Sequence, residues 1–218
     1  MSNAQSDMFD AVVLTLGFES GPLIRAVASH NLRNGARIFV LMPNFKDERA
    51  DRAFMDLNRI CSMMLGNINI NIKRIIIDLS SIDLAVRRIR ELFADLVNSN
   101  VAISIVGGMR ALCLATFIAY LLTSWQKEPH IEISLEGRGE TLKVPPVHKV
   151  LDFIITKEKL NVLHFLAKYG PANTGRIATS LDRDRSTIHR HLLWLEEKGL
   201  VRRTGREFEV TKLGMLLA

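Results

Sequence analysis

The stretch SIVGGMRAL, residues 104–112, places an arginine where a helix is expected to begin. An apolar run typical of a buried strand ends at residue 106, and a long apolar segment follows Arg110. The amino end of a helix carries partial positive charge, because its first backbone N–H groups have no partner within the helix. Gly107 and Gly108 would let a ligand approach those N–H groups closely. These residues indicate a site for an anion, and a phosphate suits both the helix end and the arginine.

The same residues also have a structural interpretation. Gly107 and Gly108 would permit close packing of a strand against a helix, with Arg110 solvated. Glu19 is favourable beside a helix amino end without any ligand, and Phe18 in a turn is consistent with half-buried packing. Both interpretations remain open at this point.

The segments around these residues alternate between strand and helix patterns. Apolar runs at 11–16, 36–43, 70–80 and 101–106 are typical of buried strands, and helical patterns follow at 23–34, 47–65, 82–97 and from about 108 to 125. This alternation predicts an α/β domain over residues 1–145 with a mostly parallel sheet covered on both faces. Residues 130–146 predict a closing hairpin, with its turn at 137–139 and a linker at Pro145 and Pro146.

Ligands of open α/β sheets bind beyond the carboxyl ends of the strands. Those ends read TLGFES, MPNF, DLSS and VGGMR, without a G-x-G-x-x-G fingerprint or a Walker A lysine motif. We therefore expect neither a tightly held dinucleotide cofactor nor ATP hydrolysis. The candidate ligand-binding residues lie at three of these ends: Thr15, Leu16, Gly17, Phe18, Glu19, Pro43, Asn44, Gly107, Gly108, Met109 and Arg110.

Residues 146–218 predict a second domain with a winged helix-turn-helix. Helical patterns cover a segment ended by Gly170 and Pro171, then 174–181 and 186–198, and the stretch VRRTGREFEV predicts a hairpin. Positive charge is concentrated here, with 13 Lys and Arg against 8 Asp and Glu, whereas residues 1–145 hold 16 against 15. This distribution favours binding of double-stranded DNA.

In a helix-turn-helix the second of the two helices, here the segment 186–198, presents its outer face to the major groove. The hairpin, or wing, suits contacts to phosphates or the minor groove. The candidate DNA-binding residues are Arg185, Ser186, Thr187, His189, Arg190, Arg202, Arg203 and Arg206. A winged helix that serves protein interaction, with its basic residues solvated, is the alternative. The histidines of this domain lack the ligand spacing of a zinc site, so we assign no metal.

The remaining composition favours a cytoplasmic protein. Cys61 and Cys113 lie far apart among apolar residues, which suits reduced, buried thiols. The polar start MSNAQSDMFD lacks a secretory pattern, and the longest apolar run, 111–125, is shorter than the roughly 20 residues of a membrane span. We expect no membrane partner.

The order of these motifs resembles that of CRISPR-associated transcriptional regulators of the Csa type, which carry a CARF domain, the CRISPR-associated Rossmann fold. TLGFES after the first strand and GGMR after the fourth carry the resemblance, together with the carboxy-terminal winged helix. It implies a Rossmann-like N-terminal domain that forms a homodimer. It also implies an effector bound at the twofold axis, a cyclic oligoadenylate and above all cyclic tetra-adenylate.

The resemblance and the residues together predict a ligand-responsive DNA-binding transcriptional regulator in antiviral defence. We assign no catalytic residue, because nothing marks a dedicated base, and no cofactor, because no cofactor-binding motif is present. The alternatives are a ring nuclease that cleaves cyclic oligoadenylate and a regulator that responds to an unrelated phosphorylated metabolite.

Overall fold

The computed structural model of the chain describes residues 8–135 and 139–218. The chain divides into two compact units, residues 1–144 and 145–218, which are described separately below. In the hairpin turn expected at 137–139, residues 137 and 138 lie outside the described residues.

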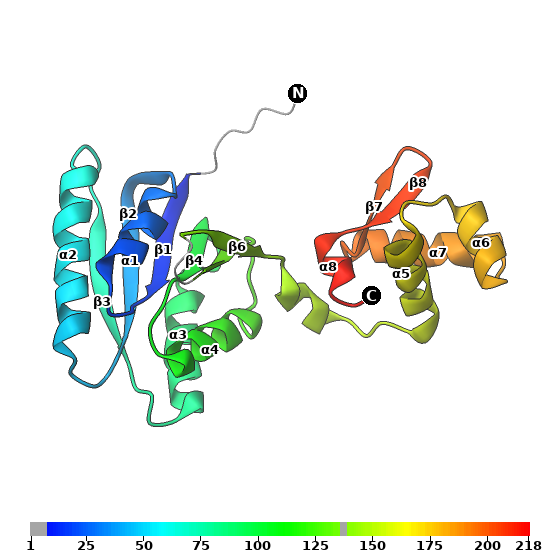
Figure 1. Ribbon diagram of the computed structural model, residues 1–218. Helices are drawn as coiled ribbons and strands as arrows, with labels where there is room; N and C mark the ends of the chain where they lie inside the picture. The colour runs from blue at the N-terminus through cyan, green and yellow to red at the C-terminus, as the bar shows by residue number, and fades with distance from the viewer. Residues whose placement is uncertain (1–7, 136–138) are drawn as a thin grey trace. The chain divides into compact units, whose positions relative to one another are not determined.

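The N-terminal unit is built on a mixed sheet (Figure 1). Among the described residues, six strands pair in the order β3-β2-β1-β4-β5-β6. Neighbouring strands are parallel except at the antiparallel pair β5 and β6. The expected mostly parallel sheet is therefore confirmed. The strands are β1 (Phe9–Thr15), β2 (Leu32–Pro43), β3 (Asn71–Ile77), β4 (Val101–Ile105), β5 (His130–Ser134) and β6 (Thr141–Val144).

Helices flank this sheet, and β1 forms its centre. Every side chain of β1 from Ala11 to Thr15 is fully buried, as expected for a strand covered on both faces. One core cluster joins alternate residues of β1 and β2 to α1 and α2, and α4 contacts β1 and β2 while packing against α3. The helices are α1 (Ser20–Ala28), α2 (Glu48–Met64), α3 (Ile82–Ala94) and α4 (Arg110–Leu121).

The helix predicted over 23–34 is wrong at its carboxyl end. The structure ends α1 at Ala28, and β2 begins at Leu32, which pairs with Phe9 and is buried. Gly35 has a φ of 84°, a conformation that a helix does not allow. Leu32 is thus buried through strand pairing, a long-range contact that the local helical pattern does not reveal.

The apolar segment 111–125 forms most of α4, which ends at Leu121 and not near residue 125 as expected, and Leu112, Ala115, Ala119 and Tyr120 bury one side of it. Leu114 and Leu122 on the same segment are 55% and 50% exposed. Across the residues that the structure describes, none of the helices has the length and apolar character needed to cross a membrane. Cys61 on α2 is buried as expected, and burial raises the pKa of its thiol to about 11.

The C-terminal unit consists of short helices and a β-hairpin (Figure 1). Its core joins Leu163, Ile177, Ile188 and Leu192 from successive helices to Phe208 of the hairpin. The order of three helices and a hairpin was expected from the sequence, whereas the first and last short helices were not. The elements are the 3-10 helix η1 (Val147–Asp152), α5 (Lys157–Tyr169), α6 (Thr174–Leu181), α7 (Arg185–Glu197), β7 (Val201–Thr204), β8 (Glu207–Val210) and α8 (Lys212–Met215).

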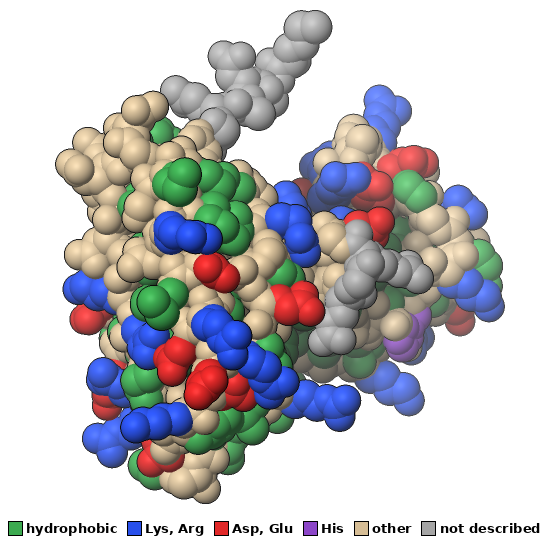
Figure 2. Space-filling view, turned by 60° about the vertical axis from the view of Figure 1, so that its left-hand side comes forward, with side chains coloured by type: hydrophobic (Ala, Val, Ile, Leu, Met, Phe, Trp, Pro, Cys, Tyr) green, Lys and Arg blue, Asp and Glu red, His purple; other side chains and the backbone are tan. Residues whose placement is uncertain are grey.

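The two units differ in net charge by composition. On the face drawn in Figure 2, blue Lys and Arg side chains are interspersed with red Asp and Glu over the N-terminal unit. This mixture agrees with the 16 basic and 15 acidic residues of positions 1–145. Of the net charge of +6, residues 146–218 contribute +5.

Candidate functional site

The loops after β1 and β4 meet backbone to backbone. A Cβ on Gly17 would lie 3.1 Å from the backbone nitrogen of Gly108. Gly108 has a φ of 103°, and the carbonyl oxygen of Leu16 occupies the place that its Cβ would take. Gly17 and Gly108 therefore permit close packing of the two loops. Gly107 is less crowded, because its Cβ would be in ordinary contact, 3.8 Å from the Cα of Gly17.

Thr15, the last residue of β1, forms side-chain hydrogen bonds to the loop after β4. Its side chain is fully buried, and its Oγ1 accepts hydrogen bonds from the backbone nitrogens of Val106, at 3.2 Å, and Gly107, at 3.4 Å. Leu16 is also buried. Of the predicted ligand-binding residues, these two thus have their side chains inside the protein, where they position the loops.

Arg110 is the first residue of α4, and its side chain is exposed. It forms no ion pair with any residue that the structure describes. The first turn of α4 contains no acidic residue, so the positive end of the helix and the guanidinium are not neutralised locally. Met109, which precedes the helix, is 39% exposed. The arginine expected at a helix start therefore adds an exposed positive charge to the positive end of α4.

A large open cavity of about 1190 Å³ lies beside these loops. It brings together five predicted ligand-binding residues, namely Gly17, Phe18, Glu19, Gly107 and Gly108. Arg25 of α1 and Ser134 and Thr141 of the β5–β6 hairpin also line it, and the sequence analysis did not select them. The described lining does not include the other six candidates: Thr15, Leu16, Pro43, Asn44, Met109 and Arg110.

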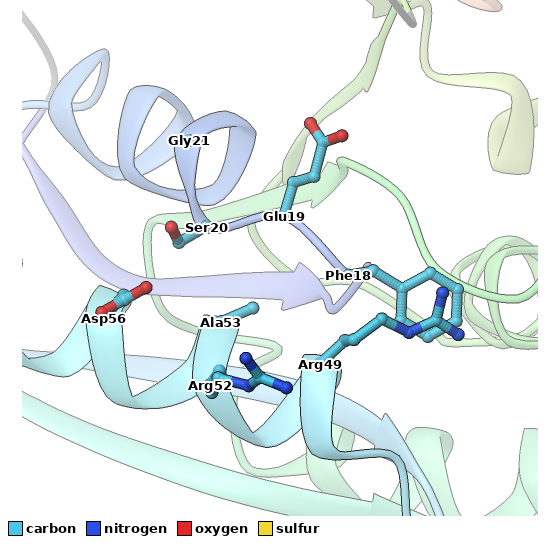
Figure 3. Close-up of a pocket in the computed structure, with 8 residues that line it drawn as sticks. All are labelled: Phe18, Glu19, Ser20, Gly21, Arg49, Arg52, Ala53 and Asp56. Atoms are coloured by element: carbon cyan, nitrogen blue, oxygen red, sulfur yellow. The ribbon is translucent and has the colours of Figure 1, made fainter.

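A smaller cavity of about 310 Å³ separates the β1–α1 loop from α2 (Figure 3). Phe18 and Glu19 line this cavity as well as the large one. Arg49 of α2 also lines this cavity, and its guanidinium carbon lies 4.1 Å from the centre of the Phe18 ring. Sequence reasoning missed Arg49. Its place in the first turn of a helix that follows a strand end is the signal that could have found it.

Asp47 fixes Arg49 in this position. Asp47 caps α2 by accepting a hydrogen bond from the Arg49 backbone nitrogen at 2.9 Å, and its other oxygen lies 3.0 Å from the guanidinium. The Arg49 side chain is the main cause that lowers the pKa of Asp47, and the same pairing raises the pKa of Arg49. The cation over Phe18 is thereby both oriented and partly neutralised.

Asn44 connects the ends of β2 and β3. Its Nδ2 donates to Asp78 Oδ1 at 2.8 Å, and the Ser80 backbone nitrogen donates to the same oxygen at 2.9 Å. The hydrogen bond from Ser80 is the main cause that lowers the pKa of Asp78. Pro43 ends β2 beside them. The predicted residues Pro43 and Asn44 thus belong to a neighbouring loop pair, away from the cavity lining.

A buried polar cluster that the sequence did not reveal lies between α1 and strands β4 and β5. Glu132 Oε1 accepts from Ser104 Oγ at 2.8 Å and lies 3.2 Å from His30 Nε2, and its Oε2 lies 3.5 Å from His130 Nε2. Burial opposes ionisation, but hydrogen bonds from His130, His30 and Ser104 outweigh it and hold the pKa of Glu132 far below its usual range. Within residues 8–135 and 139–218, no three His, Cys, Asp or Glu side chains are grouped as metal ligands.

The predicted DNA-binding residues lie on α7 and on the β7–β8 hairpin. Arg185, Ser186, His189 and Arg190 of α7 are exposed, whereas Thr187 is half-buried. On the hairpin Arg202, Arg203 and Arg206 are all exposed.

Two of the hairpin arginines have partners. Arg202 pairs with Glu209, and this pairing is the main cause that lowers the pKa of Glu209. Arg203 donates through Nε to the Gly205 carbonyl oxygen at 3.0 Å. Arg206 forms no ion pair with the described residues, so its guanidinium is available to a ligand.

The sheet order and the loops at the strand ends define a Rossmann-like α/β domain. A family model described as the Csa3 CRISPR-associated Rossmann-like domain matches residues 10–145. The chain belongs to this CRISPR-associated family. A second family model, described as the HVO_A0261 N-terminal domain, matches residues 149–218.

Solved structures and a curated protein are similar to parts of the chain. Can2 from Sulfobacillus thermosulfidooxidans in complex with cyclic tetra-adenylate is 15% identical with a TM-score of 0.43, covering 96% of this chain and 57% of that one. A Type III CRISPR defence DNA nuclease activated by cyclic oligoadenylate is 14% identical with a TM-score of 0.41, covering 88% and 31%. The phenylalanine–tRNA ligase alpha subunit of Methanopyrus kandleri is 40% identical over 60 residues, which are 28% of this chain and 12% of that protein. The chain thus spans between 12% and 57% of the length of these proteins.

Proposed function

We propose that the protein is a dimeric, DNA-binding transcriptional regulator of a CRISPR-associated system, and that its N-terminal unit senses a cyclic oligoadenylate, cyclic tetra-adenylate in particular. The observation that carries the proposal is the exposed Arg110 at the amino end of α4, next to loops packed through Gly17 and Gly108. Membership of the CRISPR-associated family supports it.

The ligand part of the proposal rests on charge and space. Arg110, the first N–H groups of α4 and Arg25 provide positive charge around the strand ends, and the large cavity offers about 1190 Å³. Phosphates bind well at such a helix end, and an arginine adds a planar fork of donors. A cyclic oligonucleotide supplies several phosphates joined to bases that need room beside them.

The dimer part rests on the outer face of α4. Leu114 and Leu122 are about half exposed there, beside the partly buried Phe117 and Ile118. Residues spaced three or four apart share one helix face, so these side chains form an apolar seam. An isologous dimer through α4 would cover the seam and bring two copies of Arg110 to one axis, which matches a symmetric polyanion.

The DNA part rests on the C-terminal unit. In a winged helix-turn-helix, α7 would enter the major groove and the β7–β8 hairpin would contact phosphates. The exposed Arg190 and Arg206 and the excess of 13 basic over 8 acidic residues support this role. Ligand binding would bias the placement of two such units and so change affinity for an operator of two half-sites.

Calorimetric titration with cyclic tetra-adenylate tests the sensor. Wild type is expected to bind tightly. Arg110→Gln should lose at least 10-fold in affinity, because a charged hydrogen bond is worth roughly 1.5–3 kcal/mol. Arg90→Gln on α3 is the control and should bind as wild type does. Repeating the titration with promoter DNA should shift the affinity, because coupling between two ligands is reciprocal. Wild type that binds no cyclic tetra-adenylate would overturn the sensor assignment.

Chromatography of the ligand after prolonged incubation distinguishes the regulator from a ring nuclease. Intact ring is expected for a regulator. Linear products formed by wild type and absent with Arg110→Gln would establish the enzyme instead.

A further inference from the structure

Phe18 is an exposed aromatic residue beside both cavities. It lies in the loop between β1 and α1 and is 48% exposed, although burial of a phenylalanine side chain is strongly favourable. It is among the residues that line both cavities. A solvent-exposed ring on the wall of a charged cavity is available to another planar group.

Arg49 holds this ring from the side of the smaller cavity. Its guanidinium carbon is 4.1 Å from the ring centre, within the range of a cation–π contact. Figure 3 shows the guanidinium of Arg49 beside the ring, with the Glu19 carboxylate pointing away from both. The Asp47 carboxylate accepts hydrogen bonds from both the backbone nitrogen and the guanidinium of Arg49. The cap of α2 therefore fixes the cation, and the cation restricts the ring.

The ring adjoins the groups that would bind phosphate. Phe18 follows Gly17, whose backbone is packed against Gly108, and Gly107 and Gly108 line the large cavity together with Phe18. A nucleotide that places a phosphate at the start of α4 would therefore have its base near the ring. Glu19 also lines this cavity and offers a carboxylate acceptor, which suits the exocyclic amine of adenine.

We infer that Phe18, held by Arg49, is the stacking platform for an adenine of the cyclic ligand, and that it determines the preference for adenine over a pyrimidine. The inference rests on the proposed function, because it names the base-binding part of the same site. Stacking on a preordered aromatic ring costs little conformational entropy, and a purine offers a larger stacking surface than a pyrimidine.

The experiment compares two rings that carry equal numbers of phosphates, cyclic tetra-adenylate and cyclic tetra-uridylate. Phe18→Leu is expected to weaken binding of cyclic tetra-adenylate by at least about 5-fold, because each lost stacking contact costs roughly 1–3 kcal/mol and the dimer loses two. It should affect cyclic tetra-uridylate much less. Phe18→Trp should retain the preference for adenine. Arg49→Gln should lose part of the affinity, because the ring then loses its fixed neighbour.

The chain offers matched controls for both substitutions. Phe45 is 46% exposed in the loop after β2 and lies outside the described lining of both cavities, so Phe45→Leu should bind as wild type. Arg52 lies one turn after Arg49, lines the same small cavity and pairs with Glu48, so Arg52→Gln should also bind as wild type. Circular dichroism of each variant verifies folding, and binding by Phe18→Trp shows that the loop tolerates replacement.

The outcomes separate this inference from the proposed function. If wild type binds cyclic tetra-adenylate and the Phe18→Leu and Phe45→Leu variants bind it equally well, the stacking platform is overturned. The sensor assignment then stands. Equal losses for the adenine and uridine rings would also overturn it, because the base would not be what Phe18 recognises. Wild type that binds neither ring would overturn the sensor and this inference with it.

Discussion

Gly108 and Leu16 are in contact through their backbones, and the Leu16 carbonyl oxygen occupies the place that a Cβ on residue 108 would need. Gly108 also has a φ of 103°, which L-residues with a side chain rarely adopt. Two independent physical reasons thus require glycine at this position. The contact joins the loop after β1 to the loop before α4. It therefore constrains the position of Arg110, the first residue of α4.

Gly108→Ala should therefore destabilise the N-terminal unit. We expect a loss of about 1–3 kcal/mol from the strained backbone alone, with a further loss from the displaced Leu16 carbonyl. Urea unfolding followed by the fluorescence of Trp125, with Trp194→Phe as the common background, measures this unit. Gly107→Ala is the matched control, because its Cβ would meet Gly17 at an ordinary 3.8 Å. Equal stability of the two variants would contradict the packing argument.

Thr15→Val should remove the acceptor that the loop before α4 requires. The Val106 and Gly107 nitrogens both donate to Thr15 Oγ1, and Thr15 is fully buried. Leaving buried donors without a partner costs roughly 1–3 kcal/mol. Thr15→Ser keeps the hydroxyl and should retain most of the stability in the same unfolding experiment. A valine variant as stable as wild type would show that water or a shifted loop satisfies both donors.

Glu132 should make the stability of the N-terminal unit depend on pH. Its pKa in the folded protein is lowered from the ordinary value of 4.5. The carboxylate therefore contributes stability that is present above about pH 4.5 and is lost as pH falls toward the folded-state pKa. The groups that face it are Ser104 on β4, His130 on β5 and His30 after α1, and the ring of Phe9 on β1 packs on both histidines.

Glu132→Gln should lower the free energy of unfolding near pH 7 by about 1–3 kcal/mol, because charged hydrogen bonds are lost. The difference from wild type should shrink as pH falls below 4.5. Urea unfolding of both proteins at several pH values between 3 and 7 measures this difference. Parallel stability curves over that range would argue against an ionised Glu132 in the folded protein.

Arg190→Ala and Arg206→Ala should each weaken DNA binding and its salt dependence. An arginine that contacts a phosphate contributes about one unit to the slope of log affinity against log salt concentration. Fluorescence anisotropy with promoter duplexes at several salt concentrations gives this slope. Lys168→Ala on α5 is the control for the loss of one positive charge elsewhere in the unit. Slopes unchanged in both arginine variants would favour a protein-interaction role for the C-terminal unit.

Much of the fold was predictable because the patterns that encode it are local. The apolar runs 11–16, 36–43 and 101–106 predicted strands, and β1, β2 and β4 are observed there, with residues 16 and 106 just beyond the ends of β1 and β4. The loops after β1 and β4 were correctly expected to lie at the carboxyl ends of the strands. Arg110 was correctly placed at a helix start, where its exposure and local charge are now visible.

Contacts between distant residues were not predictable in this way. The end of α1 depends on pairing of Leu32 with Phe9, and the hydrogen bond of Thr15 to Val106 joins residues 91 positions apart. Arg49 meets Phe18 because α2 packs beside the loop after β1, and Glu132 meets His30 across the sheet. Periodicity and propensity specify which residues form an element and which face is apolar. The order β3-β2-β1-β4-β5-β6 and the packing of helices on that sheet decide which side chains meet, because those contacts join segments that are far apart along the chain.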